Sequence, residues 1–147
     1  MNLKNTYVRI NDELASELMI NCLTASVFGV PVLLVTGDQM LCDSMSEACP
    51  GTLTVPVMYG VGSGTVSIHP DKAVRLIREA AEKAVQLDPA LCLFPLPEYF
   101  TVEVGYRFHG DARSASFYPD ARLEGSTSVV FESNEWEDCL RFFHFCL

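Results

Sequence analysis

Two polar residues near the start of the chain have the types and spacing to act together on a metal ion. Glu17 and Asn21 stand four residues apart in the stretch NDELASELMIN, so they share one face of a predicted helix. A carboxylate in this position can ligate a metal, or it can be a solvated or helix-capping group. Because zinc takes about four donors, Glu17 would need further ligands to hold it.

A third candidate, Asp38, follows an apolar run. The run Val30–Val35 is closed by Thr36-Gly37-Asp38, which predicts a strand buried on both faces of a parallel sheet. Asp38 then lies beyond the carboxyl end of that strand, where ligands of open α/β sheets gather. Its carboxylate can also cap the helix that follows.

A glycine-rich segment, Tyr59–Ser67 (YGVGSGTVS), leads to His69 and Pro70. As a loop, it could offer backbone amides to an anion, or it could be an ordinary surface turn. It lacks the Lys-Ser or Lys-Thr pair of a Walker loop. His69 could be catalytic, although a histidine before a helix often caps it.

The remaining histidines and the cysteines do not form a recognisable site. The three histidines show neither HExxH nor HxH spacing, and the six cysteines include no CxxC pair. We therefore assign no catalytic residue from pattern alone. The cysteines lie mostly in apolar surroundings, which favours reduced core thiols in a cytoplasmic protein.

Composition excludes two classes of partner. The chain has 147 residues and a formal net charge of −9, which argues against nucleic acid because phosphate binding needs clustered basic residues. No run of eighteen apolar residues is present, so we expect no membrane span.

The expected fold class is α/β, with a parallel-type β/α layer over residues 1–90 and a small α+β appendage over 91–147. The boundary is placed where the helical pattern gives way to the proline-rich DPALCLFPLP. Periodicity and turn signals predict the elements. We expect strands at Tyr7–Ile10, Val30–Val35, Thr52–Val57, Glu98–Phe108 and Thr127–Glu132. We expect helices at Glu13–Val27 (capped by Asp12), from Asp38 to Ala48, from Pro70 to Leu87, at Gly110–Tyr118 and after Asn134, which is expected to cap the last helix.

Three ordered blocks resemble the later part of the M55 peptidases, the zinc D-aminopeptidases of the DppA type. INDELASELMIN is similar to a family stretch ING-x-x-x-GE-x-x-x-N, in which Asn11, Glu17 and Asn21 match. FGVPVLLVTGD is similar to the family block GVPV-x-x-VTGD, and SIHPDKA to its LHPE-x-A. The second block includes Asp38 and the third includes His69.

The resemblance implies a metallo-hydrolase ancestry. In the family, two zinc ions are held by an Asp-x-Glu, two histidines and the Glu of the GE pattern, and Glu17 matches that last ligand. The other ligands precede the matching part of the family, so we expect this chain to lack them. Ser16 stands where the family has glycine.

Two functions follow as hypotheses. The first is an M55-type D-aminopeptidase-like chain that lacks most zinc ligands and is inactive alone, with peptide substrates if a complementary chain supplies the rest. The second is a non-enzymatic scaffold derived from that family. Both predict a homo-oligomer or a partner chain. A weaker third hypothesis is an anion binder that uses the glycine segment.

Overall fold

The computed structural model describes residues 4–147 and is a mixed α/β protein, as expected. Within this range, none of the helices is both long and apolar enough to cross a bilayer. The strands are β1 (Asn5–Ile10), β2 (Glu13–Leu14), β3 (Leu34–Asp38), β4 (Leu53–Val61), β5 (Gly64–Ser67), β6 (Phe100–Tyr106), β7 (Arg122–Glu124) and β8 (Ser128–Ser133). The helices are α1 (Glu17–Val27), α2 (Gln39–Ala48), α3 (Pro70–Ala84), α4 (His109–Ala115) and α5 (Trp136–Cys146), with a short 3₁₀ turn at Pro89–Cys92.

The chain forms two compact units, which divide it differently from the boundary expected near residue 90. The first unit combines the chain up to Asn21 with Pro97–Leu147, and the second is Cys22–Leu96. The difference arises because β1 pairs with β6, a partner that follows it by more than ninety residues in the sequence.

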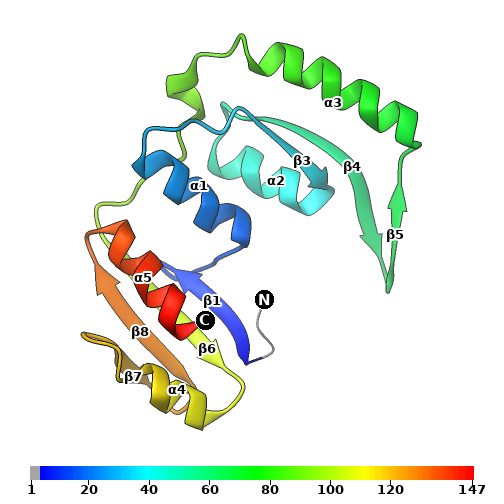
Figure 1. Cartoon of the computed structure of the whole chain (residues 1–147). Coiled ribbons are helices and arrows are strands. Elements are labelled where there is room, and N and C mark those ends of the chain that lie inside the picture. The colour runs from blue at the N-terminus through cyan, green and yellow to red at the C-terminus, as the bar shows by residue number, and fades with distance from the viewer. Residues whose placement is uncertain (1–3) are drawn as a thin grey trace. The chain divides into compact units, whose positions relative to one another are not determined.

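The first unit is built on an antiparallel sheet in the order β2-β1-β6-β8-β7. Alternating apolar residues make one face of the sheet the core, and helices α4 and α5 pack against it (Figure 1). Phe142 of α5 stacks on Phe131 of β8, with ring centroids 5.1 Å apart. The buried side chains of this face include Val8, Ile10, Val102, Val104, Val129 and Phe131.

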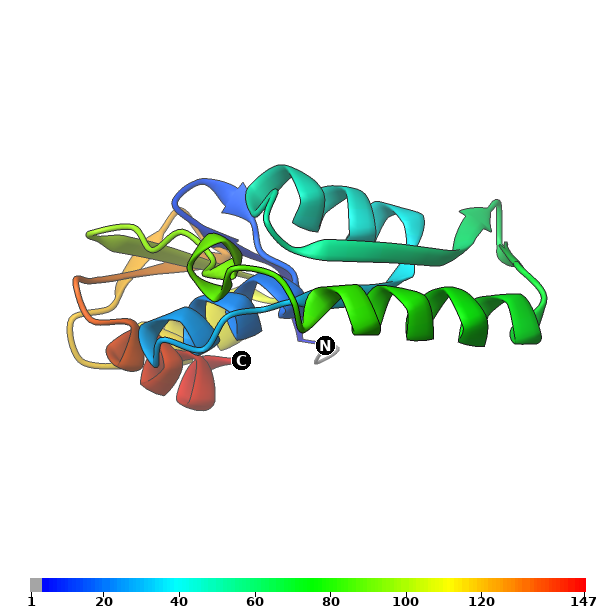
Figure 2. The same ribbon diagram turned by 90° about the horizontal axis from the view of Figure 1, so that it is seen from above.

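The second unit contains a parallel strand pair and a hairpin. β3 pairs in parallel with β4, which pairs with β5 in antiparallel fashion. Helix α2 makes the crossover between the parallel strands, and α2 and α3 lie on either side of β4 (Figure 2). In α2, Cys42 and Met45 are buried one turn apart, which gives the helix its inward face.

The apolar run ahead of Asp38 corrects an expectation. β3 spans only Leu34–Asp38, and Val30 is 53% exposed. β3 lies at the edge of its three-stranded sheet, so one side of the strand has no neighbour among the described residues. Within β3 only Val35 is buried, and Thr36 and Asp38 are exposed, so the prediction of a strand buried on both faces was wrong for the described residues.

Three other local expectations were also wrong. Asp12 does not cap α1, because Asn11 and Asp12 adopt positive φ in a turn after β1, and α1 begins only at Glu17, where Ser16 Oγ accepts a hydrogen bond from Met19 N (3.2 Å). Asn134 does not cap α5; the oxygen of Ser133 accepts from Glu135 N (3.0 Å) instead. The expected glycine loop is the β4–β5 hairpin, turned at Gly62 with φ +57°.

All six cysteines are unpaired and buried, which agrees with the expectation of core thiols. Burial raises the pKa of Cys139 to about 12 and that of Cys146 to about 11. Both residues lie on the inward face of α5 with Trp136 and Phe142. Their thiols therefore behave as small apolar groups of the first unit's core.

We predict that Gly105→Ala destabilises the protein by about 1–3 kcal/mol. Gly105 lies opposite Tyr7 in the β1–β6 register, and a Cβ at this position would overlap the Tyr7 ring. Urea unfolding measures the effect. Combining Gly105→Ala with Tyr7→Ala should recover part of the loss, because the ring would no longer occupy that space.

Gly110→Ala is the matched control. Gly110 lies within α4, and a Cβ there would meet no atom within 4 Å. This variant should leave stability unchanged or raise it by up to about 1 kcal/mol. Equal destabilisation by the two substitutions would contradict the proposed packing of Tyr7 on Gly105.

We also predict that stability falls as pH rises from about 9 to about 12. The Cys139 thiol has an ordinary pKa of 9.0 and a folded pKa of about 12, so in this window the unfolded chain loses a proton that the folded protein keeps. One such group lowers the free energy of unfolding by about 1.4 kcal/mol per pH unit. Urea unfolding between pH 8 and pH 11 should give a shallower decline for Cys139→Ala than for the unsubstituted protein.

Candidate functional site

Glu17 and Asn21 lie on the first half of α1 in the first unit. They are one helical turn apart, as expected, and both side chains are exposed. Glu17 is the acidic residue of the first turn, where a carboxylate is favoured by the helix dipole. The pair offers a carboxylate and an amide to solvent, which is fewer donors than zinc requires.

Asp38 caps α2 in the second unit. Its Oδ1 accepts a hydrogen bond from Leu41 N at 3.0 Å, and its extended backbone places it at the carboxyl end of β3. The capping role predicted from the sequence is confirmed. This use of Oδ1 leaves Oδ2 as the oxygen available to any ligand at the strand end.

His69 caps α3. Its Nδ1 accepts a hydrogen bond from Asp71 N at 3.2 Å, and Pro70 occupies the first turn, as suits its fixed φ. The Asp71 carboxylate lies farther from the same nitrogen, at 3.7 Å. The closer contact is the one to the backbone amide, so we interpret His69 as the cap of α3.

Within each of the two units, the described candidate residues do not form a metal site. Glu17 and Asn21 belong to the first unit, whereas Asp38 and His69 belong to the second. Across residues 4–147, no group of three or more His, Cys, Asp and Glu side chains is arranged to hold a metal ion. The described side chains therefore do not fit a complete zinc site.

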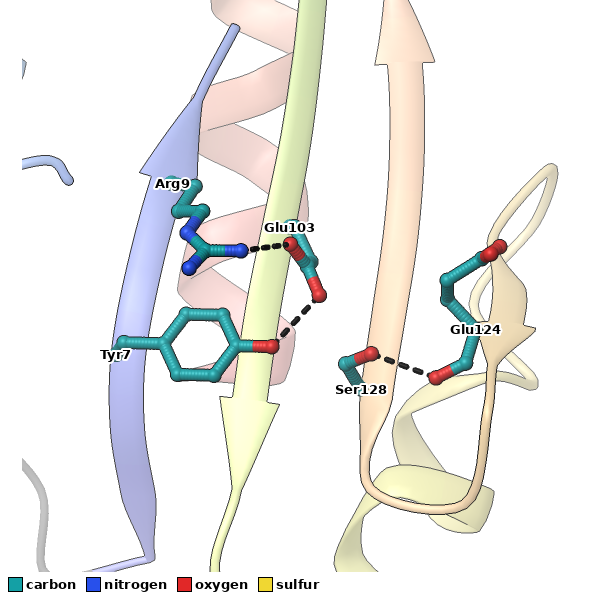
Figure 3. Close-up of polar contacts among 5 residues, drawn as sticks. All are labelled: Tyr7, Arg9, Glu103, Glu124 and Ser128. Atoms are coloured by element: carbon teal, nitrogen blue, oxygen red, sulfur yellow. Dashed lines mark hydrogen bonds and ion pairs between the residues drawn. The ribbon is translucent and has the colours of Figure 1, made fainter. Parts of the chain in front are cut away.

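A polar network that sequence reasoning missed lies on the outward face of the first unit's sheet. Tyr7 Oη donates to Glu103 Oε1 at 2.6 Å, and Arg9 Nη1 lies 3.5 Å from Glu103 Oε2 (Figure 3). The Arg9 guanidinium also lies 4.9 Å from the centre of the Tyr7 ring. Next to this cluster, Ser128 Oγ donates to the Glu124 carbonyl at 2.6 Å.

The network joins β1 to β6 rather than providing a reactive group. The hydrogen bond to Glu103 raises the pKa of Tyr7, so the phenol stays protonated and is a poor general base. The alternation of β6 already placed Glu103 on an outward face. Local periodicity could not show that β1 pairs with β6, and this pairing places Tyr7 and Arg9 beside Glu103.

Comparison with known proteins places these elements in a family. Residues 1–145 match a model of the M55 peptidase family, described as D-aminopeptidase. A D-aminopeptidase of Bacillus subtilis (strain 168) is 28% identical over 128 residues, which cover 86% of this chain and 47% of that protein.

A solved structure is similar in fold. It is described as the Zn-dependent D-aminopeptidase DppA from Bacillus subtilis, a self-compartmentalizing protease, and it matches with a TM-score of 0.80 and 26% identity. The match covers 99% of this chain and 56% of DppA, so the chain spans about half the length of these relatives. With the family model matching nearly every residue, the chain belongs to the M55 peptidase family of D-aminopeptidases.

Proposed function

We propose that this protein is an M55-type D-aminopeptidase-like chain whose ancestral chemistry is the metal-dependent removal of D-amino acids from peptide amino termini. Residues 4–147 contribute Glu17 to a zinc site whose other ligands lie outside this segment. The main support for this proposal is the match of residues 1–145 to the family. Residues 4–147 nevertheless contain no group of three or more His, Cys, Asp and Glu side chains that could hold a metal ion.

The donor chemistry supports a contribution of one ligand. Zinc sites in proteins use about four donors, and Asn21 lies one turn after Glu17 on the same helix face. Asp38 and His69 both accept hydrogen bonds from backbone amides at helix starts. We therefore derive no catalytic step for the isolated chain and assign no catalytic residue.

Exposed apolar surface supports a partner. β3 is an edge strand of a parallel pair, and parallel strands are normally covered on both sides. Exposed apolar side chains of this unit include Val30, Met40, Met58, Tyr59 and Val61. DppA is described as self-compartmentalizing. We propose a homo-oligomer or a complex with a complementary chain, located in the cytoplasm in keeping with its unpaired cysteines.

The alternative is a scaffold without enzymatic activity. It is favoured by the same shortage of ligands, since a chain that only assembles does not need them. The two proposals differ in the role of Glu17. It is a zinc ligand in the first and an exposed residue of a helix start in the second.

The first test measures zinc and activity in the chain alone and in a mixture. Purified without chelator or metal-affinity tag, the chain alone should contain far less than one zinc and should not hydrolyse a D-alanyl peptide. Mixed with a polypeptide made from the part of DppA that this chain does not match, it should gain zinc and activity. Stoichiometric zinc and activity in the chain alone would overturn the proposal of a shared site.

Glu17→Gln should abolish the gain of zinc and activity in that mixture, because an amide is a far weaker zinc ligand than a carboxylate. Glu13→Gln is the matched control, since Glu13 is an exposed carboxylate on the nearby β2. Neither substitution should shift thermal unfolding by more than a few degrees. A mixture in which Glu17→Gln gains zinc and activity like the unsubstituted chain would contradict the assignment of Glu17 as a zinc ligand.

Assembly is tested separately by sedimentation velocity. We expect species larger than the 16.3 kDa chain at micromolar concentration, because the edge strand and the exposed apolar residues favour association. Val30→Lys should reduce the larger species, whereas Val74→Lys, at an exposed site on α3, should not. A single species of the monomer mass would contradict the assembly proposal.

A further inference from the structure

A cavity of about 340 Å³ lies at one end of the first unit's sheet. Its lining comes from the start of β1, the end of β6, helix α4 and the end of α5, elements that Figure 1 shows together at that end of the sheet. This volume is within the range that proteins use for small ligands. None of the residues discussed above as possible metal ligands lines it.

Asn5 gives the cavity an unsatisfied acceptor. The residue is only 6% exposed, and its side-chain oxygen Oδ1 is buried without a hydrogen-bond partner. Such a group is rare in folded proteins because it has given up water and gained nothing in return. A ligand that donates a hydrogen bond would satisfy it.

Asp111 adds a second acceptor with negative charge. Its half-buried carboxylate lines the same cavity and makes no hydrogen bond or ion pair with the rest of residues 4–147. By contrast, two donors of the lining already have acceptors. Tyr106 Oη donates to the Cys146 carbonyl at 2.8 Å, and Ser114 Oγ donates to the Gly110 carbonyl at 3.0 Å.

Aromatic rings complete the wall. Tyr118 and Phe145 line the cavity with ring centroids 6.1 Å apart. Aromatic faces attract cations and pack against apolar groups. Lys4 also lines the cavity, and it has an interaction partner within the protein.

We propose that this cavity binds a small primary ammonium compound with an apolar or aromatic body. The ammonium group donates to Asn5 Oδ1 and to the Asp111 carboxylate, and the body packs against Tyr118 and Phe145. A charged ligand is favoured over a neutral one because it meets a carboxylate in a partly enclosed site. The proposal stands on residues of the first unit alone and does not depend on the metal chemistry proposed above.

The test uses three probes of nearly the same shape and calorimetric titration of the full chain. Phenethylamine carries the ammonium group, N-acetylphenethylamine is neutral, and 3-phenylpropionate is an anion. We expect phenethylamine to bind with a dissociation constant on the order of 1 mM or tighter, and the other two to bind at least tenfold more weakly. Equal binding of all three, preference for the anion or no binding of the amine would overturn the proposal.

Variants locate the binding. Asp111→Asn should weaken phenethylamine binding at least tenfold, whereas Glu137→Gln, which removes an exposed carboxylate of α5 outside the cavity lining, should not change it. Asn5→Leu should also abolish binding while keeping or raising the thermal midpoint, because it replaces a buried unpaired group with an apolar one of similar size. Unchanged affinity in Asp111→Asn would place the amine elsewhere and refute the assignment.

Discussion

The pairing of β1 with β6 is the constraint on which the first unit depends. It sets Arg9 opposite Glu103 and Tyr7 opposite Gly105, so one register produces both the polar network and the ring-on-glycine packing. The same register turns Val8 and Val104 inward, towards α4 and α5. A slip of one residue would bury the charged side chains and expose the apolar ones. Burial on one face and ionic pairing on the other therefore specify the same alignment.

Local patterns predicted the elements better than their partners. The capping residues Asp38 and His69 were predicted because their hydrogen bonds lie within three residues of themselves. The prediction that Asp12 caps a helix was wrong. An acidic residue before an apolar stretch resembles a cap, but Asp12 has a positive φ and lies in a turn. The buried strand predicted from Val30 onward was wrong for a different reason. An apolar run indicates which side chains a strand would bury, but it does not indicate whether other elements are present to cover them.

The candidate site shows the same division between local and distant information. The spacing of Glu17 and Asn21 on one helix face could be predicted because helical geometry is fixed. That no group of three or more His, Cys, Asp and Glu side chains gathers in residues 4–147 depends on the fold. The cavity at Asn5 could not be predicted either, because its lining comes from positions near both ends of the described chain. Family resemblance supplied the chemical hypothesis that these separate polar groups could not.

The second unit is an insertion in the sequence of the first, between Asn21 and Pro97. This arrangement bears on the order of folding during synthesis. Cys22–Leu96 is continuous and can form its contacts once it leaves the ribosome. The central β1–β6–β8 strands of the first unit must wait until β6 and β8 have been made, and β1 must close a loop of about ninety residues to pair, which slows folding. Until then the nascent β1 has no partner on its β6 side, so this strand is the segment on which a chaperone would have the longest time to act.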